Sequence, residues 1–404
     1  MERLPLFEEN FSKNILSPHI QKIAKVVSDQ ISLTSQPGWM TGLAGMGVFL
    51  REYGDCGDRL DGPPQVTALA GILEKIVGMV NDGFSYPTLA AGLTGIVWTF
   101  RYLGDRGLID HDDAHVLDEL IPFIQRYADH ELKNGNFDAL HGGTGPGIVG
   151  LIDNDGKARS SDGAKAVCLQ DTFSSLEDDN DLDLGLAHGL TSLIVYFSEN
   201  CKGSSCHPCE GRDLLVSSIT KLLSHADLTQ KLSSVFPTRL IKGQAQYPSR
   251  LAWCYGDVGI AMGLLHCAQD FKVETLKGLR VEKLKGSEVF DFAVEVLVRA
   301  AERRDSLNTR IIDPYFCHGA SGLAFMFYKA WVLSNNDKLK EAAQFWTKET
   351  IRFLETTHPP GKIYKTEGVV FGDGSLLNGL SGIGLALLAI ERGVLPGWEK
   401  GLLI

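Results

Sequence analysis

The segment GASGLAFMFY, residues 319–328, contains the two features that decide the fold. A Gly-x-x-Gly pair opens the segment, and an apolar run without any charged side chain follows it. A run that is hydrophobic on most of its faces is typical of a helix buried in the middle of a protein. The same pattern begins at six further glycines, which are Gly42, Gly92, Gly142, Gly189, Gly256 and Gly379.

The seven copies recur at intervals of about 47 to 67 residues and span nearly the whole chain. Between them, residues 66–77, 117–124 and 290–297 carry apolar side chains at helical spacing, which predicts amphipathic helices with a polar outer face. Each repeat is therefore expected to hold one outer helix, a glycine turn and one inner helix. Because the repeats leave no room for anything else, we expect one all-α domain, residues 1–404.

Seven such hairpins can stack as an open solenoid or close into a ring. A closed ring is favoured, because the inner helices are apolar almost all round and neither end shows a polar capping repeat. Closure would gather the glycine turns at one mouth, where the missing side chains let helix ends approach closely. None of the turns resembles a phosphate-binding loop, since no Lys-Ser or Lys-Thr follows.

Composition and charge argue against several classes of function. A net charge of −11 and a pI near 5.5 do not suit a protein that binds nucleic acid or an anionic membrane. No apolar run reaches the roughly 18 residues of a membrane span, and the polar N-terminus does not read as a signal peptide. Eight cysteines without an export signal are typical of a reducing compartment, so we expect a cytoplasmic protein.

Two stretches interrupt the pattern. The fourth copy has Ser192 in place of its second glycine, and residues 153–183 before it are polar, with an acidic run at Glu177–Asp183. We expect a loop there instead of a full outer helix.

The second irregular stretch gathers three thiols and an imidazole, from Cys201, Cys206, His207 and Cys209. These groups suit a second, structural zinc ion, but the spacing is irregular and no distant Cys-x-x-Cys completes a set. A surface loop with free thiols is the alternative that we favour.

The candidate functional residues stand just before the glycine turns. Cys254 and Cys317 occupy the same position in the fifth and sixth repeats, and His318 follows Cys317 directly. A ring makes equivalent positions neighbours in space, so these three side chains are expected to converge. Two thiolates and one imidazole suit Zn²⁺, and three protein ligands leave a fourth position open, as in catalytic sites. In the alternative interpretation the cysteines are small buried hydrophobes and the histidine caps a helix.

Together with the seven repeats, the motifs Trp253-Cys254-Tyr255-Gly256 and Cys317-His318-Gly319 make the chain resemble the lanthionine synthetase C-like cyclases. The resemblance covers essentially the whole chain, and these two motifs are its specific part. It implies an α/α toroid and one catalytic zinc ion held by Cys254, Cys317 and His318.

The same resemblance implies four active-site residues, which are His188, Asp138, Arg250 and Tyr255. The chain departs from the family pattern at Ser192, at the additional His141, in the reduced fourth outer helix, and in lacking the domain that some members insert between the first two repeats. These departures bear on substrate preference and docking more than on chemistry.

The family implies a zinc-dependent lanthipeptide cyclase. A peptide thiol loses its proton at zinc and adds to a dehydroalanine or dehydrobutyrine, which closes a (methyl)lanthionine thioether ring. The enolate formed then takes a proton at its α-carbon, for which His188 is the candidate acid, with Asp138 orienting it. Arg250 would stabilise enolate charge or hold a residue that supports the site. The structural alternatives are a helix N-cap for Asp138, an ion pair for Arg250 and a core histidine for His188.

Other functions remain open on sequence alone. Addition of glutathione or another thiol to dehydroamino acids of damaged proteins would use the same site. A non-catalytic zinc-containing scaffold would bind peptide only. A glycoside hydrolase would need two acids at the mouth, for which only Asp138 and Asp257 qualify by repeat position. For the cyclase, the expected partners are a dehydrated, leader-bearing precursor peptide and a separate dehydratase.

Overall fold

The computed structural model describes residues 4–54, 64–152, 181–200, 210–229, 233–244, 247–270, 286–366 and 369–404. These residues form two compact units. The first unit comprises Met1–Ile121 and Ile311–Gly401, and the second comprises Pro122–Arg310 and Leu402–Ile404. Helices dominate both units, and the sequence-based expectation of a single domain stays a prediction.

The first unit contains the first, second, sixth and seventh repeats. Its apolar helices are α3 (Leu43–Gly54), α5 (Leu93–Asp105), α15 (Ala320–Ser334) and α17 (Leu380–Arg392). Its amphipathic helices are α2 (Ser17–Gln30), α4 (Pro64–Asn81) and α16 (Asp337–Glu355), and the short elements are α1 (Glu9–Phe11), η1 (Ser12–Leu16), α6 (His111–Ala114) and η2 (Asp118–Leu120).

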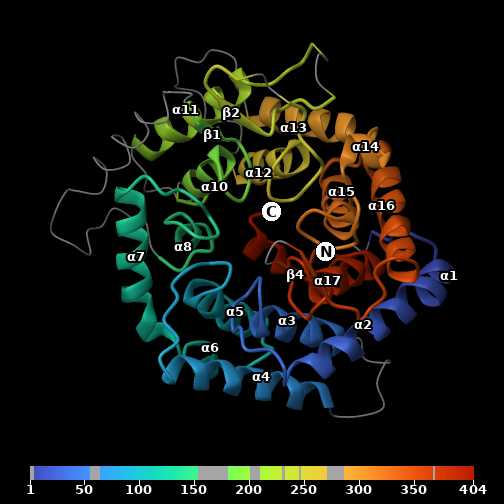
Figure 1. The fold of residues 1–404 in the computed structure, drawn as a ribbon. Coiled ribbons are helices and arrows are strands. Elements are labelled where there is room, and N and C mark those ends of the chain that lie inside the picture. The colour runs from blue at the N-terminus through green and yellow to red at the C-terminus, as the bar shows by residue number, and fades with distance from the viewer. Residues whose placement is uncertain are drawn as a thin grey trace. The chain divides into compact units, whose positions relative to one another are not determined.

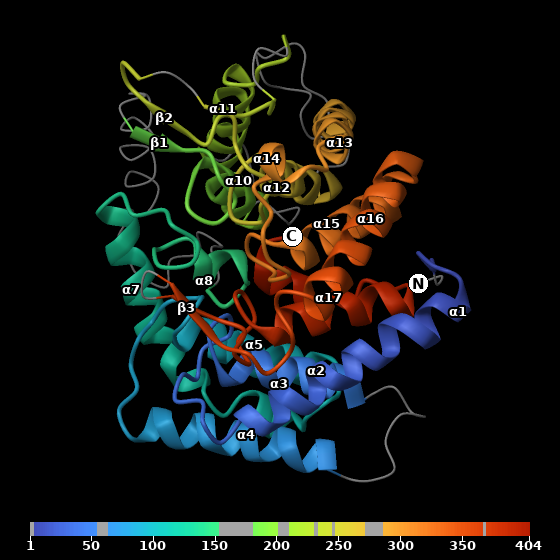
Figure 2. The same cartoon turned by 45° about the vertical axis from the view of Figure 1, so that its right-hand side comes forward.

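The order of packing in the first unit brings the two ends of the repeat series together. The apolar helices lie in the order α5, α3, α17 and α15, while α4 packs on α3 and α16 packs on α15 (Figures 1 and 2). The last apolar helix, α17, contacts both α3 and α2. Contact between the first and the last repeat is what a closed ring requires and what an open solenoid lacks.

The second unit contains the remaining three repeats. Its elements are α7 (Ile121–Lys133, whose first residue belongs to the first unit), α8 (Gly145–Ile148), α10 (Leu190–Asn200), α11 (Glu210–Ser224), α12 (Asp257–Asp270), α13 (Gly286–Ala301) and α14 (Ser306–Thr309). Helices α10 and α12 lie side by side, with α11 packed on α10 and α13 packed on α12 (Figure 1).

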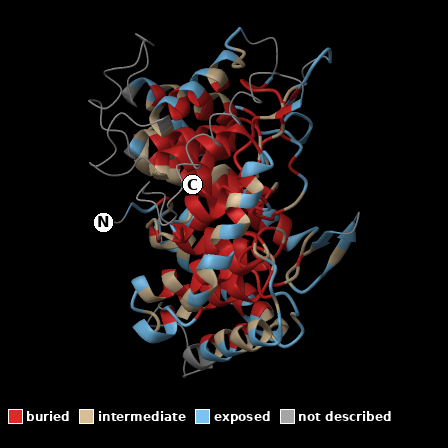
Figure 3. Ribbon diagram, turned by 90° about the vertical axis from the view of Figure 1, so that its left-hand side faces the viewer, coloured by how far each residue is buried: buried red, intermediate tan, exposed pale blue. Residues whose placement is uncertain are grey.

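Burial confirms the division into inner and outer helices. Every residue from Ala320 to Tyr328 in α15 is buried, whereas α16 alternates between buried and exposed positions. Figure 3 shows both kinds of helix, those that are buried along their length and those in which buried and exposed residues alternate. The outer helices expected at 66–77 and 290–297 are confirmed as α4 and α13. The expectation for 117–124 is confirmed in part, because α7 begins only at Ile121, after a short 3₁₀ turn.

One local expectation was wrong, and a second lies mostly outside the described residues. The third inner helix is a single turn, α8, because glycine and proline occupy its start and Gly150 then takes a left-handed conformation, with φ +72°. The loop expected over 153–183 lies outside the described residues up to 180. Its last three residues form a strand, β1 (Asp181–Asp183), which pairs antiparallel with β2 (Arg239–Ile241). A second antiparallel pair consists of β3 (Tyr364–Thr366) and β4 (Val369–Phe371).

In most of the turns, the glycines are required by close backbone approach. In the sixth repeat, a Cβ atom on Gly322 would lie 1.9 Å from the carbonyl oxygen of Phe316, and one on Gly319 would lie 2.5 Å from that of Asp313. In both cases the carbonyl group lies six residues earlier in the chain. The same six-residue relation holds for Gly42, Gly45, Gly92, Gly95, Gly189, Gly256, Gly259, Gly379 and Gly382. The packing role expected for these glycines is thereby confirmed.

Backbone hydrogen bonds connect the turns of successive repeats. In the first unit, Met40 N–H donates to the Ala90 carbonyl at 2.8 Å, and Leu377 N–H donates to the Met40 carbonyl at 3.1 Å. Cys317 N–H in turn donates to the Leu377 carbonyl at 3.0 Å. These four residues each stand two positions before the first glycine of their repeat, so equivalent positions do become spatial neighbours.

Candidate functional site

In the second unit the same type of link places Cys254 beside the segment of His188. Ala187 N–H donates to the Cys254 carbonyl at 3.0 Å, and Ala139 N–H donates to the Ala187 carbonyl at 3.0 Å. The Cys254 side chain is buried, and its neighbour Trp253 is anchored because its indole N–H donates to the Leu402 carbonyl at 2.8 Å. The repeat register therefore gathers residues from the third, fourth and fifth turns.

The side chains of Asp138 and His188, 50 residues apart in sequence, form a hydrogen-bonded pair. His188 Nδ1 lies 2.7 Å from Asp138 Oδ2, and the other carboxylate oxygen accepts the N–H groups of Leu140 at 2.8 Å and His141 at 2.9 Å. Because an ionised carboxylate only accepts, Nδ1 carries the proton and Nε2 is left to react. The carboxylate thus fixes its own turn and orients the imidazole as well, but it caps no helix, because α8 begins at Gly145 with Thr144 at its N-cap.

Each member of the pair shifts the pKa of the other toward its charged form. Burial by itself would lower the pKa of His188, but the hydrogen bond and negative charge of Asp138, with smaller contributions from Cys254 and Asp183, raise that pKa above its ordinary value of 6.5. Burial by itself would raise the pKa of Asp138, but His188 and two backbone N–H groups lower it below 3.8. The hydrogen bond and opposite charges therefore stabilise the imidazolium form of His188 and the carboxylate form of Asp138.

Arg250 and Tyr255 come from the same turn as Cys254. The Arg250 guanidinium donates to the Arg310 carbonyl at 2.7 Å, and Leu251 N–H donates to the Thr309 carbonyl at 3.1 Å, so this segment is joined to the 309–310 backbone. Tyr255 is half-buried. The sequence alone indicated neither attachment.

Asp257, the second acid that a glycoside hydrolase would need, is only 1% exposed. Its two oxygens accept the N–H groups of Phe236 at 2.9 Å and Val235 at 3.1 Å, and Arg303 Nη1 lies 3.4 Å away. Burial raises its pKa to about 6, against the opposing effect of these donors. The carboxylate is engaged in holding backbone, so no pair of free acids stands at this turn.

In the first unit, Cys317 and His318 present adjacent donor atoms. Cys317 Sγ lies 3.5 Å from His318 Nε2, the cysteine is buried and the imidazole is half-buried. With zinc–sulfur bonds of about 2.3 Å and zinc–nitrogen bonds of about 2.05 Å, a tetrahedral ion separates its sulfur and nitrogen ligands by about 3.6 Å. The spacing of these two donors therefore fits a shared zinc ion.

Sequence reasoning missed the groups that shape these turns. Asp183, Asp313 and Asp373 each stand six residues before the first glycine of a repeat, and each accepts the N–H group two residues on, at 2.6 to 3.0 Å. Such Asx turns preset the loop. The recurring Asp at a fixed distance before glycine was the available signal. The imidazole of His141, noted as additional, stacks on that of His188 with ring centroids 6.4 Å apart. Cys201, Cys206, His207 and Cys209 lie outside the described residues.

Comparison with known proteins agrees with this arrangement. The family model of lanthionine synthetase C-like proteins matches residues 28–403. The chain belongs to this family. Among solved structures it is similar to "Nisin cyclase", with a TM-score of 0.69, 19% sequence identity and 98% of each chain covered. Among curated proteins, none matches the sequence.

Membership and structural similarity together confirm the all-α fold, an α/α toroid, that the sequence predicted. Within the described residues, no helix has both the length and the apolar character needed to cross a membrane.

Proposed function

We propose that this lanthionine synthetase C-like protein is a zinc-dependent lanthipeptide cyclase. It would join peptide cysteine thiols to dehydroalanine or dehydrobutyrine residues of the same chain, forming (methyl)lanthionine rings. The observation that carries the proposal is the oriented Asp138–His188 pair, which lies one backbone link from Cys254 in a chain of this family. This addition requires a proton donor close to the metal ion that binds the substrate thiol.

We assign the zinc ion to Cys254, Cys317 and His318, each of which offers one ligand atom. The soft donor set and the 3.5 Å spacing of the last two donors support zinc. When bound, the ion would leave one position for a substrate sulfur and keep that sulfur as thiolate at neutral pH.

The protein's own residues supply the remaining chemistry. Formation of the carbon–sulfur bond leaves an enolate, and His188 would donate the proton from Nε2 to its α-carbon. The substrate thiol has meanwhile lost one proton, so the reaction is proton-neutral. Asp138 holds Nδ1–H and stabilises the imidazolium between turnovers. We assign Arg250 to stabilisation of the enolate charge, and Tyr255 to the site from its place in the shared motif.

The test compares single variants on a dehydrated precursor peptide, with ring formation read by mass spectrometry after alkylation of free thiols. Cys254→Ala and Cys317→Ala should lose zinc and ring formation together. His188→Ala should keep zinc and lose correctly closed rings. Cys267→Ala, which removes another buried thiol from α12, is the matched control and should change neither. Full zinc content in both metal-ligand variants would refute the ligand set, and full activity of His188→Ala would refute its role.

Two alternatives share this geometry. Addition of glutathione to dehydroamino acids of damaged proteins would use the same residues, and it is favoured if glutathione reacts while the peptide's own thiols do not. A peptide-binding scaffold is favoured if zinc binds but no thioether forms. For the cyclase, we propose a leader-bearing dehydrated peptide as substrate and a separate dehydratase as partner, in a cytoplasmic setting. A neighbouring gene for each would support this choice.

A further inference from the structure

Arg303 is a buried cation with contacts to three separate segments of the second unit. It follows α13 and is 8% exposed. Its Nη2 group donates to the Ser249 carbonyl and to the Asn308 carbonyl, both at 2.5 Å. Its Nη1 group lies 3.4 Å from Asp257 Oδ2, at the start of α12. One guanidinium therefore joins the residue before Arg250, the loop after α13 and the helix that follows the Cys254 turn.

The loop that Arg303 contacts is the loop that receives Arg250. Helix α14 within it is capped by Asp305, whose Oδ1 accepts Asn308 N–H at 2.9 Å. The loop ends at Arg310, a non-glycine residue in the left-handed conformation with φ 57°, whose carbonyl accepts Arg250. Left-handed backbone at such a residue costs free energy, so other contacts must hold it.

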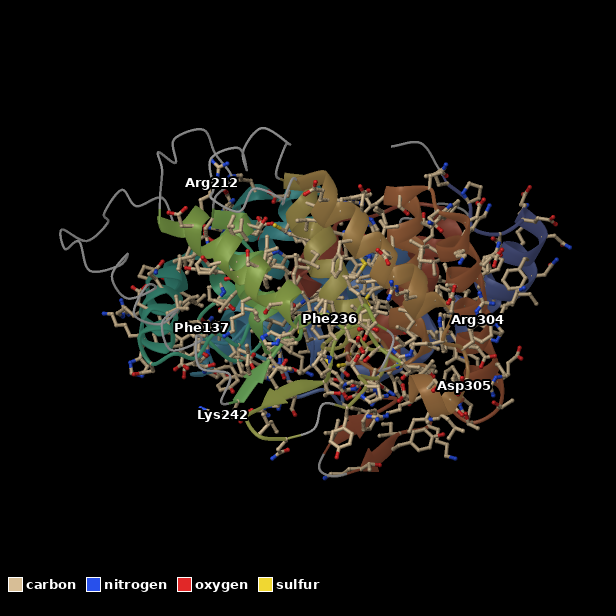
Figure 4. The ribbon with its side chains drawn as sticks, turned by 90° about the horizontal axis from the view of Figure 1, so that it is seen from above. Phe137, Arg212, Phe236, Lys242, Arg304 and Asp305 are labelled. Carbon is tan, nitrogen blue, oxygen red and sulfur yellow. The ribbon has the colours of Figure 1, made fainter. Side chains whose placement is uncertain are left out.

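Two further hydrogen bonds belong to the same set of contacts around Arg303, which we call the Arg303 frame. Asp257 accepts Phe236 N–H, and the Ser249 N–H donates to Ser234 Oγ at 3.0 Å. Figure 4 shows Phe236 among the crowded side chains, and Asp305 next to Arg304 near the surface. The frame thus extends from the interior of the second unit to its surface, with Arg303 at the point where its parts meet.

We propose that Arg303 is a positioning residue for the reaction, which sets the place of Arg250 by holding the carbonyls of Ser249 and Asn308. It acts on the two backbone segments that support Arg250 and touches no reacting atom. The inference rests on the proposed function only in taking Arg250 as part of the active site. Because a displacement of about 1 Å can cost a factor of about 10² in rate, loss of this hold should appear in kcat.

The test combines a double-mutant cycle with amide hydrogen exchange. Arg303→Gln should lower kcat at least tenfold with little change in KM and with zinc retained. The double variant with Arg250→Gln should be no slower than Arg250→Gln alone, since both remove the same function. Exchange at Leu251 and Arg310 N–H should become faster. Arg303→Lys keeps a cation with three donors, so it should fold and retain part of kcat.

Arg392→Gln is the matched control. Arg392 also bonds a buried partner, the backbone carbonyl and carboxylate of Glu52 in the first unit. Its loss should lower stability without changing kcat or exchange at Leu251. Unchanged kcat in Arg303→Gln, or a double variant whose two losses multiply, would overturn the positioning role. Absence of ring formation by the unaltered protein would reject the proposed function instead, and unchanged exchange in Arg303→Gln would still reject the positioning.

Discussion

Replacing Gly322 by alanine should damage the proposed zinc site, although Gly322 is not one of the proposed ligands. The added Cβ would stand 1.9 Å from the carbonyl oxygen of Phe316, where ordinary contacts begin near 3.4 Å. The obstacle is backbone, so no flexible side chain can move aside. A displacement of about 1.5 Å is needed, and the group that must move directly precedes Cys317.

The magnitude follows from two opposing terms. Overpacking in a dense interior costs about 1–3 kcal/mol, and a clash with backbone belongs at the upper end of that range. Alanine returns about 1 kcal/mol of helix propensity relative to glycine. The net expectation is a loss of about 2 kcal/mol in unfolding free energy. Ligand distances tolerate only about 0.2 Å, so a shift of Cys317 on the order of 1 Å should release zinc as well.

The assay measures urea unfolding and zinc content of purified protein, with Gly71→Ala as control. Gly71 lies at an exposed position of helix α4, and a Cβ there would meet nothing within 4 Å. The control should gain about 0.5–1 kcal/mol and keep its zinc. If Gly322→Ala is as stable as the unaltered protein and binds zinc fully, the close-approach explanation of the repeated glycines is wrong.

Four further predictions concern the pH dependence of activity, the pH dependence of stability, the anchoring of Trp253 and the cooperativity of unfolding. The rate of ring formation should fall as pH rises through the raised pKa of His188. Asp138→Asn should move that fall to lower pH, because Asp138 is the main group that raises this pKa. A pH–rate profile that does not move in this variant would contradict the pairing. In unfolding measurements, the pair's stabilisation should be present between the ordinary values of 3.8 and 6.5. It should be lost as pH rises through the His188 pKa or falls through the lowered pKa of Asp138. Trp253→Phe removes the donor to the buried Leu402 carbonyl and should cost about 1–3 kcal/mol in urea unfolding, and a smaller effect than Phe→Leu changes at exposed sites would argue against that anchor. If residues 1–404 form one domain, calorimetry should give one thermal transition, and two separate transitions would contradict this.

The sequence by itself determined the repeat architecture and the shared repeat position of Cys254 and Cys317, the proposed metal ligands. Glycine is needed wherever a residue packs on the carbonyl six positions earlier, and that requirement is local, so it is written into every turn. The apolar run after each turn likewise marks an inner helix without reference to distant residues. Cys254 and Cys317 each stand two residues before the first glycine of their repeat. Their equivalent positions at the turns could therefore be predicted from the repeat alignment alone.

Only the tertiary structure decided what each polar side chain near the turns does. For a glycoside hydrolase, Asp138 and Asp257 were the two acids that the sequence offered at the turns, yet one bonds His188 and the other is buried against backbone N–H groups and Arg303. The partners that separate them come from residues far away in the chain, and no local pattern encodes such contacts. Arg303 was invisible for the same reason, since its role depends on three segments meeting around one guanidinium. Steric requirements between residues close in the chain can be read from the sequence. Whether a buried charged side chain serves structure or chemistry depends on its partners, which only the folded chain brings together.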